Sequence, residues 1–225
     1  MKSFSLSKFY EKYKHGIPVL LYMILYLTWW GILEQKNARA FQIIHMAIDD
    51  YIPFCELFII PYVLWFFYVS IVVIYFFFHD RTEYYQALMF LFTGMTIFLV
   101  ISTIWPNMHQ LRLSQMPRDN IFTRVIAGLW ATDTPTNLWP SIHVYNSLGA
   151  HFAIMKSKDF ANKPVIRYAS LLLAISIICS TVLIKQHSMF DVLTAFVMAA
   201  VMYVFVYRRD FLVVMKSKIK LSFNP

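Results

Sequence analysis

The stretch Ser180–Asp191 reads Ser-Thr-Val-Leu-Ile-Lys-Gln-His-Ser-Met-Phe-Asp and lies where one long apolar run ends and the next begins. His187 and Asp191 are four residues apart, so on a helix they share one face. A carboxylate there can accept the proton of one imidazole nitrogen and leave the other nitrogen free and basic. A structural histidine–aspartate contact is the alternative, but ionisable residues at a membrane edge are usually functional. The stretch therefore predicts two helices joined at an oriented histidine.

The composition is that of a membrane protein. The 225 residues are 59% apolar and only 14% charged, and aromatic residues reach 18%, which is too apolar for a soluble domain. The apolar runs are continuous rather than alternating, which favours helices over a closed β-barrel. We expect one all-α, polytopic membrane domain over residues 1–225, with six transmembrane helices in one bundle. The expected spans are 17–33, 57–78, 86–104, 141–155, 165–184 and 188–207, with a long loop at 105–140.

The basic N-terminal segment and the first apolar run resemble a signal peptide, and Ala38-Arg39-Ala40 resembles a cleavage site. The run is longer than a usual signal core, and charged residues at 34–36 separate it from that site. We expect it to remain as the first span.

Lysine and arginine predict the orientation in the membrane. The net charge of +8 could indicate nucleic acid binding, but no such motif accompanies it. With the N-terminus in the cytoplasm, 14 of the 20 basic residues fall in inside segments and 6 in outside segments. The positive-inside rule favours that orientation. We expect an integral protein of the plasma membrane with both termini cytoplasmic and with the 105–140 loop and His187 at the outer face.

A second polar cluster follows the long loop. Trp139-Pro140-Ser141-Ile142-His143 opens a span that also holds Tyr145, Asn146, Ser147 and His151, so this span should face the bundle interior. Free backbone N–H groups at Ser141 and Ile142 could hold an anion.

Cationic side chains should surround these histidines. Arg112, Arg118, Arg124 and Lys185 all fall on the expected outer face, and arginine forks bind phosphate oxygens. Contact with lipid headgroups is the alternative for each arginine. Two histidines, a helix N-terminus and several cations together indicate phosphoryl transfer.

At these residues the chain resembles the type 2 phosphatidic acid phosphatase superfamily, which includes lipid phosphotransferases such as the sphingomyelin synthases. The family pattern is K-x6-R-P, then P-S-G-H, then S-R-x5-H-x3-D. Residues 140–143 match the second motif with Ile142 in place of glycine, and Ser180, His187 and Asp191 match the third. The order and separation of the motifs make the combination more specific than each alone.

Two departures concern the phosphate-binding positions. Thr181 stands where the third motif has arginine, and Lys185 could supply that charge. In the first motif, residues 110–113 keep Arg112 but lose the proline, and Trp105 stands at the lysine position.

The resemblance implies a role for each residue. His187 attacks phosphorus, Asp191 orients it, and His143 protonates the leaving alcohol and then activates the acceptor. Arg112, Ser141 and Lys185 hold the phosphate, with Arg118 and Arg124 as further candidates. The expected partner is a membrane lipid phosphate, with no cofactor and no metal.

The expected activity is metal-independent hydrolysis of a lipid phosphomonoester or diphosphate. One alternative is a phosphotransferase that moves a phospho-headgroup to another alcohol. Another is a non-catalytic protein that binds anionic lipid. A proton-coupled transporter would need ionisable groups near mid-span, where His151 is the one candidate.

Overall fold

Helices make up most of the chain. The computed structural model describes residues 6–35 and 41–208. In chain order the α-helices are α1 (Leu6–Tyr13), α2 (Ile17–Glu34), α3 (Ile59–His79), α4 (Arg81–Ile104), α5 (Ile121–Thr132), α6 (Ile142–Lys156), α7 (Pro164–Leu183) and α8 (Met189–Tyr203). Short 3₁₀ turns occur at Lys14–Gly16, Ala47–Asp50 and Glu56–Phe58, and a π-helical segment, Val204–Arg208, continues α8. Two short strands, β1 (Gln42–Ile43) and β2 (Asn107–Met108), pair in parallel.

Five helical segments are long and apolar enough to cross a membrane: Tyr10–Glu34, Glu56–His79, Arg81–Ile104, Pro164–Leu183 and Met189–Arg208. The protein is therefore an all-α integral membrane protein. The span expected at 141–155 is the helix α6, which has 15 residues and is not one of these five segments.

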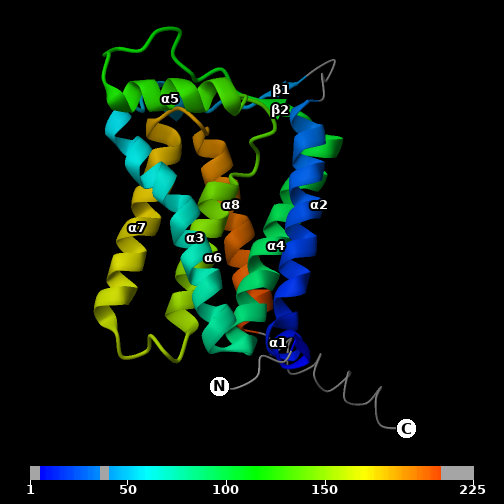
Figure 1. Ribbon diagram of the computed structural model, residues 1–225. Helices are drawn as coiled ribbons and strands as arrows, with labels where there is room; N and C mark the ends of the chain where they lie inside the picture. The colour runs from blue at the N-terminus through cyan, green and yellow to red at the C-terminus, as the bar shows by residue number, and fades with distance from the viewer. Residues whose placement is uncertain (1–5, 36–40, 209–225) are drawn as a thin grey trace.

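Helix α6 lies at the centre of the bundle, with α3, α4, α7 and α8 around it (Figure 1). Small residues allow the close packing: a methyl group at Gly149 would come within 2.6 Å of the Phe90 ring, and one at Gly94 would overlap the Tyr145 ring. The Tyr145 hydroxyl donates to the Phe90 carbonyl at 2.8 Å. The polar residues of α6 thus face protein, as its sequence predicts.

The sequence predicts a tight polar turn at residues 79–83 between the second and third spans, and the connection between α3 and α4 is shorter than this turn. Helix α3 continues through His79, and α4 begins at Arg81. Asp80 alone separates them, because its carboxylate accepts from the backbone N–H groups of Thr82 and Glu83 at 2.7 and 2.8 Å. This N-cap extends α4 five residues before the apolar run expected at 86.

Helix α5 lies across one end of the bundle, beside the paired strands (Figure 1). Asn120 caps it by accepting from Phe122 N and Thr123 N. The sequence predicts a short surface helix near 120–130, and α5 occupies that place. The long 105–140 loop is therefore an ordered cover over the bundle end.

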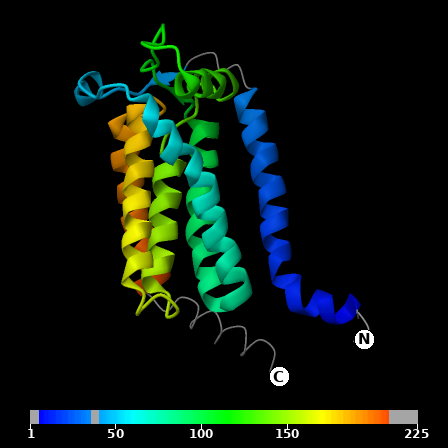
Figure 2. The ribbon, with the colours of Figure 1, turned by 60° about the vertical axis from the view of Figure 1, so that its left-hand side comes forward.

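Helix α2 stands to one side of the bundle (Figure 2). It contacts α4 through side-chain hydrogen bonds, among them those from Tyr22 Oη to Phe92 O at 2.9 Å and from Trp29 Nε1 to Thr103 Oγ1 at 3.0 Å. Its other apolar side chains are largely exposed in the isolated chain, as expected for a helix that faces lipid.

Several residues used to predict the orientation lie outside the described residues. They are Lys2, Lys36, Arg39, Arg209, Lys216, Lys218 and Lys220. The cleavage-like sequence at 38–40 also lies there.

Candidate active site

The turn between α7 and α8 positions His187. The backbone N–H groups of Gln186 and His187 both donate to Thr181 O at 2.9 Å. Lys185 takes a left-handed conformation with φ of 57°, which lets the chain reverse direction before Ser188 caps α8. The turn thus holds His187 directly before Ser188, the N-cap of α8.

Asp191 fixes the imidazole of His187. Its Oδ2 lies 3.1 Å from His187 Nδ1 and also accepts from Ser188 N at 3.1 Å. Both side chains are buried, at 5% and 1% exposure. A carboxylate only accepts, so it favours the proton on Nδ1 and leaves Nε2 as the free nitrogen. This is the arrangement that the sequence predicts for this pair.

His143 comes from the first turn of α6. Ser141 caps that helix by accepting from Val144 N, and its own N–H donates to Asp191 O at 3.4 Å, which ties the starts of α6 and α8 together. The His143 ring stacks on Tyr62 with a centroid distance of 4.5 Å, and Trp65 lies 4.2 Å away. Its Nε2 is buried and has no hydrogen-bond partner within residues 6–35 and 41–208.

The two histidines open onto one cavity, here called the histidine cavity. Their ring centroids are 5.8 Å apart, and the cavity measures about 380 Å³. Aromatic side chains form much of its wall, and polar groups gather near the histidines. The lining residues are Tyr26, Leu27, Trp30, Tyr62, Trp65, Phe66, Phe98, Leu129, Thr132, Asp133, Thr136, Asn137, Leu138, Ile142, His143, Gln186 and His187.

Arg112 lies next to the histidine cavity but does not line it. Its guanidinium donates to Trp130 O at 3.0 Å, and to Asp133 O and Gln186 Oε1 at 2.7 Å each. Burial lowers the pKa of Arg112. The Gln186 side chain in turn donates from Nε2 to Asp133 Oδ2 at 3.1 Å. Arg112 thus acts on the cavity through its neighbours.

Lys185 points away from the histidine cavity. Its Nζ donates to Ile52 O at 2.6 Å and to Asp49 O at 3.2 Å. Burial lowers the pKa of Lys185. These bonds tie the α7–α8 turn to the segment before α3.

The remaining predicted phosphate ligands also lie outside the cavity lining. Arg118 pairs with Glu56 at 2.7 Å. Arg124 pairs with Asp119 at 2.8 Å on the surface. Ser141 is fully buried and caps α6. The structure therefore brings together the two histidines and Asp191 and places Arg112 beside them. Ser141 contacts Asp191 through its backbone N–H but does not line the cavity, and Arg118, Arg124 and Lys185 lie elsewhere.

Asp133 is the carboxylate that lines the cavity, and sequence reasoning did not assign it to the site. Burial raises its pKa, while Arg112 opposes that shift. No sequence pattern points to Asp133, because it reaches the site through Gln186, which lies 53 residues away in the chain.

His109 supports the peptide before His187. Its Nδ1 accepts from Leu111 N at 3.2 Å, so Nε2 carries the proton that binds Gln186 O at 2.9 Å. The side chain is 1% exposed, and burial lowers its pKa to about 4.

Asp49 supports the same turn from the other side. Its carboxylate accepts from Ser188 Oγ at 2.6 Å and from Met189 N at 2.8 Å. The sequence carries no signal for this contact, which spans about 140 residues of chain.

No family model matches this chain, and no curated protein or solved structure matches it. Within the described residues, no three or more His, Cys, Asp or Glu side chains are arranged to hold a metal ion.

Proposed function

We propose that this protein is a membrane-embedded lipid phosphatase that works through a phosphohistidine on His187. One observation carries the proposal: His187, with Nδ1 held by Asp191, shares one cavity with His143. The motif resemblance to the type 2 phosphatidic acid phosphatases gives the same roles. The function therefore rests on the agreement of motif and geometry.

The reaction has two steps. In the first, His187 Nε2 attacks phosphorus, the bond from phosphorus to the lipid oxygen breaks, and the leaving oxygen takes a proton from His143. In the second, His143 removes a proton from water, the water oxygen attacks phosphorus, and the P–N bond breaks to release phosphate. Asp191 stabilises the positive charge that develops on His187 during attack.

The cavity wall favours an amphipathic substrate. Tyr26, Leu27 and Trp30 of α2 are among the residues that line the cavity, and α2 stands apart from α3 (Figure 2). A lipid could enter between these helices, with its phosphate at the histidines and its chain along the aromatic wall. Most of the ligand-binding surface would then be apolar, as in other small-molecule sites.

We propose further that α6 is a sixth crossing and that the histidine cavity faces out of the cell. Helix α6 is shielded by its neighbours, so its polar composition does not preclude a crossing. Single cysteines at exposed Arg124 and Lys158, in a variant in which Cys55 and Cys179 are replaced by serine, test the orientation. An impermeant thiol reagent on intact cells should label position 124 and spare position 158, and the reverse pattern would place the cavity inside.

The lining also favours a second candidate, a phosphotransferase acting on a phosphodiester. No Lys or Arg is among the residues that line the cavity as far as the chain is described, whereas Asp133 is. A carboxylate there repels a dianionic phosphomonoester more than a singly charged diester. This enzyme would pass the phospho-headgroup from His187 to a second lipid alcohol instead of water.

Phosphate release by detergent-purified protein decides between these activities. The substrate panel should contain phosphatidic acid, phosphatidylglycerol phosphate, isoprenyl diphosphates, and a labelled phospholipid with diacylglycerol as acceptor. A phosphatase releases inorganic phosphate without acceptor, whereas a phosphotransferase labels the acceptor lipid. Activity should survive EDTA.

The histidine roles need a matched control. His187→Ala should abolish turnover and the acid-labile phosphoenzyme, whereas His45→Ala should keep both, since His45 pairs with exposed Asp50 away from the cavity. Full activity of folded His187→Ala would refute the proposed nucleophile.

A further inference from the structure

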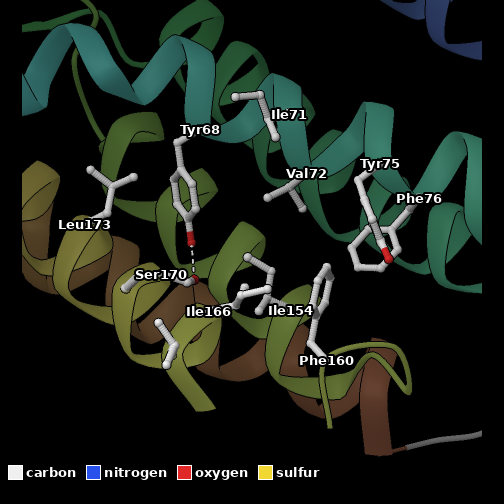
Figure 3. Close-up of a pocket in the computed structure, with 12 residues that line it drawn as sticks. Tyr68, Ile71, Val72, Tyr75, Phe76, Ile154, Phe160, Ile166, Ser170 and Leu173 are labelled. Atoms are coloured by element: carbon white, nitrogen blue, oxygen red, sulfur yellow. Dashed lines mark hydrogen bonds between the residues drawn. The ribbon is translucent and has the colours of Figure 1, made fainter. Parts of the chain in front are cut away.

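A second cavity lies at the opposite half of the bundle, between α3 and α7, and is here called the α3–α7 groove. It measures about 350 Å³. Figure 3 shows Tyr68 and Leu173 towards one end and Tyr75, Phe76 and Phe160 gathered at the other. The lining comes from the C-terminal half of α3, the N-terminal half of α7, one residue of α6 and the loop before α7. The proposed reaction uses none of these residues.

The polar groups in this groove satisfy one another. Tyr68 Oη and Ser170 Oγ are 2.7 Å apart, as the dashed line in Figure 3 marks. Ser170 Oγ also lies 2.9 Å from His151 Nδ1. Hydroxyls that are already paired offer little to a polar ligand, and the remaining wall is aliphatic or aromatic. The groove therefore suits a hydrocarbon chain.

The groove has the length of an acyl chain in one leaflet. Its α3 wall extends from Tyr68 to Phe76, which is about 12 Å at about 1.5 Å per helical residue. Half of a hydrocarbon core of about 30 Å is about 15 Å. Exposed Ile71 and Val165 at its rim show that the groove opens to the outside of the bundle, where lipid chains lie.

Positive charge lies at the loop end of the groove. Lys163 Nζ lies 5.4 Å from the centroid of the Phe160 ring, which lines the groove, and no carboxylate pairs with it among the described residues. The loop also contains Lys158, and Arg167 follows in the first turn of α7. Two carboxylates lie at this loop, Asp159 and Glu83, and the Oε1 of Glu83 accepts from Lys158 N at 3.0 Å. Asp159 accepts from Tyr75 Oη at 3.0 Å. Lysines beside a chain-sized groove favour a negatively charged headgroup.

We propose that the α3–α7 groove binds one acyl chain of an anionic phospholipid from the bilayer, with the lipid phosphate next to Lys163. The chain fills the space between Tyr68 and Phe160, and the lysines at the loop hold the headgroup. This site is separate from the histidine cavity and binds lipid without chemical change.

Native mass spectrometry of the protein with phosphatidylglycerol or phosphatidylcholine tests the groove. Ala169 lines the groove, so Ala169→Trp places an indole in it and should remove the retained lipid. Leu172 belongs to the same helix but does not line the groove, and its side chain is 65% exposed, so Leu172→Trp should keep the lipid. Ile71→Trp and Ile74→Trp form a second pair on α3, in which only Ile71 lines the groove. If Ala169→Trp does not fold, this α3 pair tests whether the groove retains the lipid. Equal lipid retention within both pairs would overturn the site.

The headgroup preference has its own control. Lys156 lies in the same loop region, but its Nζ sits 5.3 Å over the Tyr203 ring of α8, away from the groove. Lys163→Gln should weaken phosphatidylglycerol binding about fivefold, which corresponds to the typical contribution of one basic residue near a membrane surface. Lys156→Gln should leave it unchanged. Equal effects of the two substitutions, or equal retention of the two lipids by the wild type, would refute the anionic preference.

Discussion

Replacing Asp49 by asparagine should destabilise the protein, although Asp49 lies outside the histidine cavity. The Asp49 carboxylate is 2% exposed. Its Oδ2 accepts from Met46 N at 2.8 Å and Ser188 Oγ at 2.6 Å, and its Oδ1 accepts from Met189 N at 2.8 Å. All the groups around the carboxylate are donors, so an amide nitrogen at either position must face a donor.

The magnitude follows from these contacts. If the asparagine oxygen replaces Oδ2, the amide nitrogen faces Met189 N–H and one charge-assisted bond is lost, at about 1.5–3 kcal/mol. The negative charge at the start of α8 also disappears, at about 0.3–1 kcal/mol. Asp49→Asn should therefore lower the free energy of unfolding by about 2–4 kcal/mol. For a chain of this size this is about 4–16 °C in Tm.

Asp50→Asn is the matched control. Its side chain is 64% exposed and contacts His45, so the change should stay within about 0.5 kcal/mol. A thiol-reactive dye can follow thermal unfolding in detergent, because the chain has two free, half-buried cysteines, Cys55 and Cys179. Equal unfolding temperatures for the two variants would show that the Asp49 carboxylate does not support the α7–α8 turn. Activity of the folded Asp49→Asn protein should also fall, because His187 lies in the turn that Asp49 holds at Ser188 and Met189.

Three further predictions concern the histidines and the helix packing. With nitrophenyl phosphate, whose leaving group needs no proton, His143→Ala should give a burst of nitrophenol in rapid-quench kinetics, whereas His187→Ala should give none; a burst from His187→Ala alone would reverse the roles. The pKa of His109 is about 4 in the folded protein against 6.5 ordinarily, so its contribution to stability is complete above pH 6.5 and is lost as the pH falls to about 4. The loss should reach about 3 kcal/mol, and a pH series of Tm should show a smaller acid loss for His109→Gln. Gly94→Ala should lower the free energy of unfolding by about 1–3 kcal/mol because the added methyl group overlaps an aromatic ring of α6. Gly31→Ala should not, because its added methyl group would have no packing neighbour within 4 Å among the described residues. Equal melting temperatures of the two variants would contradict the close packing of α4 and α6.

The sequence is sufficient for the helices and for the local part of the site. Long apolar runs must form internally bonded helices in a membrane, and the helices α2, α3, α7 and α8 follow the predicted runs closely. The contact between His187 and Asp191 was predictable because the two residues are only four positions apart in the chain. His187 itself lies before Ser188, the N-cap of α8, so the capping turn brings the two side chains together. The early start of α4 was missed because a single capping residue, Asp80, replaced the expected turn.

The surroundings of the two histidines depend on tertiary structure. The distribution of basic residues predicted that Arg112 and Lys185 lie at the same membrane face as His187. In the folded chain, Lys185 donates to the carbonyls of Asp49 and Ile52. Arg112 is surrounded by hydrogen-bond acceptors. A buried cation binds whichever acceptors the fold brings near it, because an unpaired charge there is costly.

The same reason explains the residues that sequence reasoning missed. His109 and Asp49 reach the α7–α8 turn across 77 and about 140 residues of chain. No spacing rule relates such positions, since their distance depends on how β1, β2 and the bundle end pack together. The sequence by itself determined the helices and the oriented histidine, and the tertiary structure decided which charges surround it, because those charges come from segments that only folding brings together.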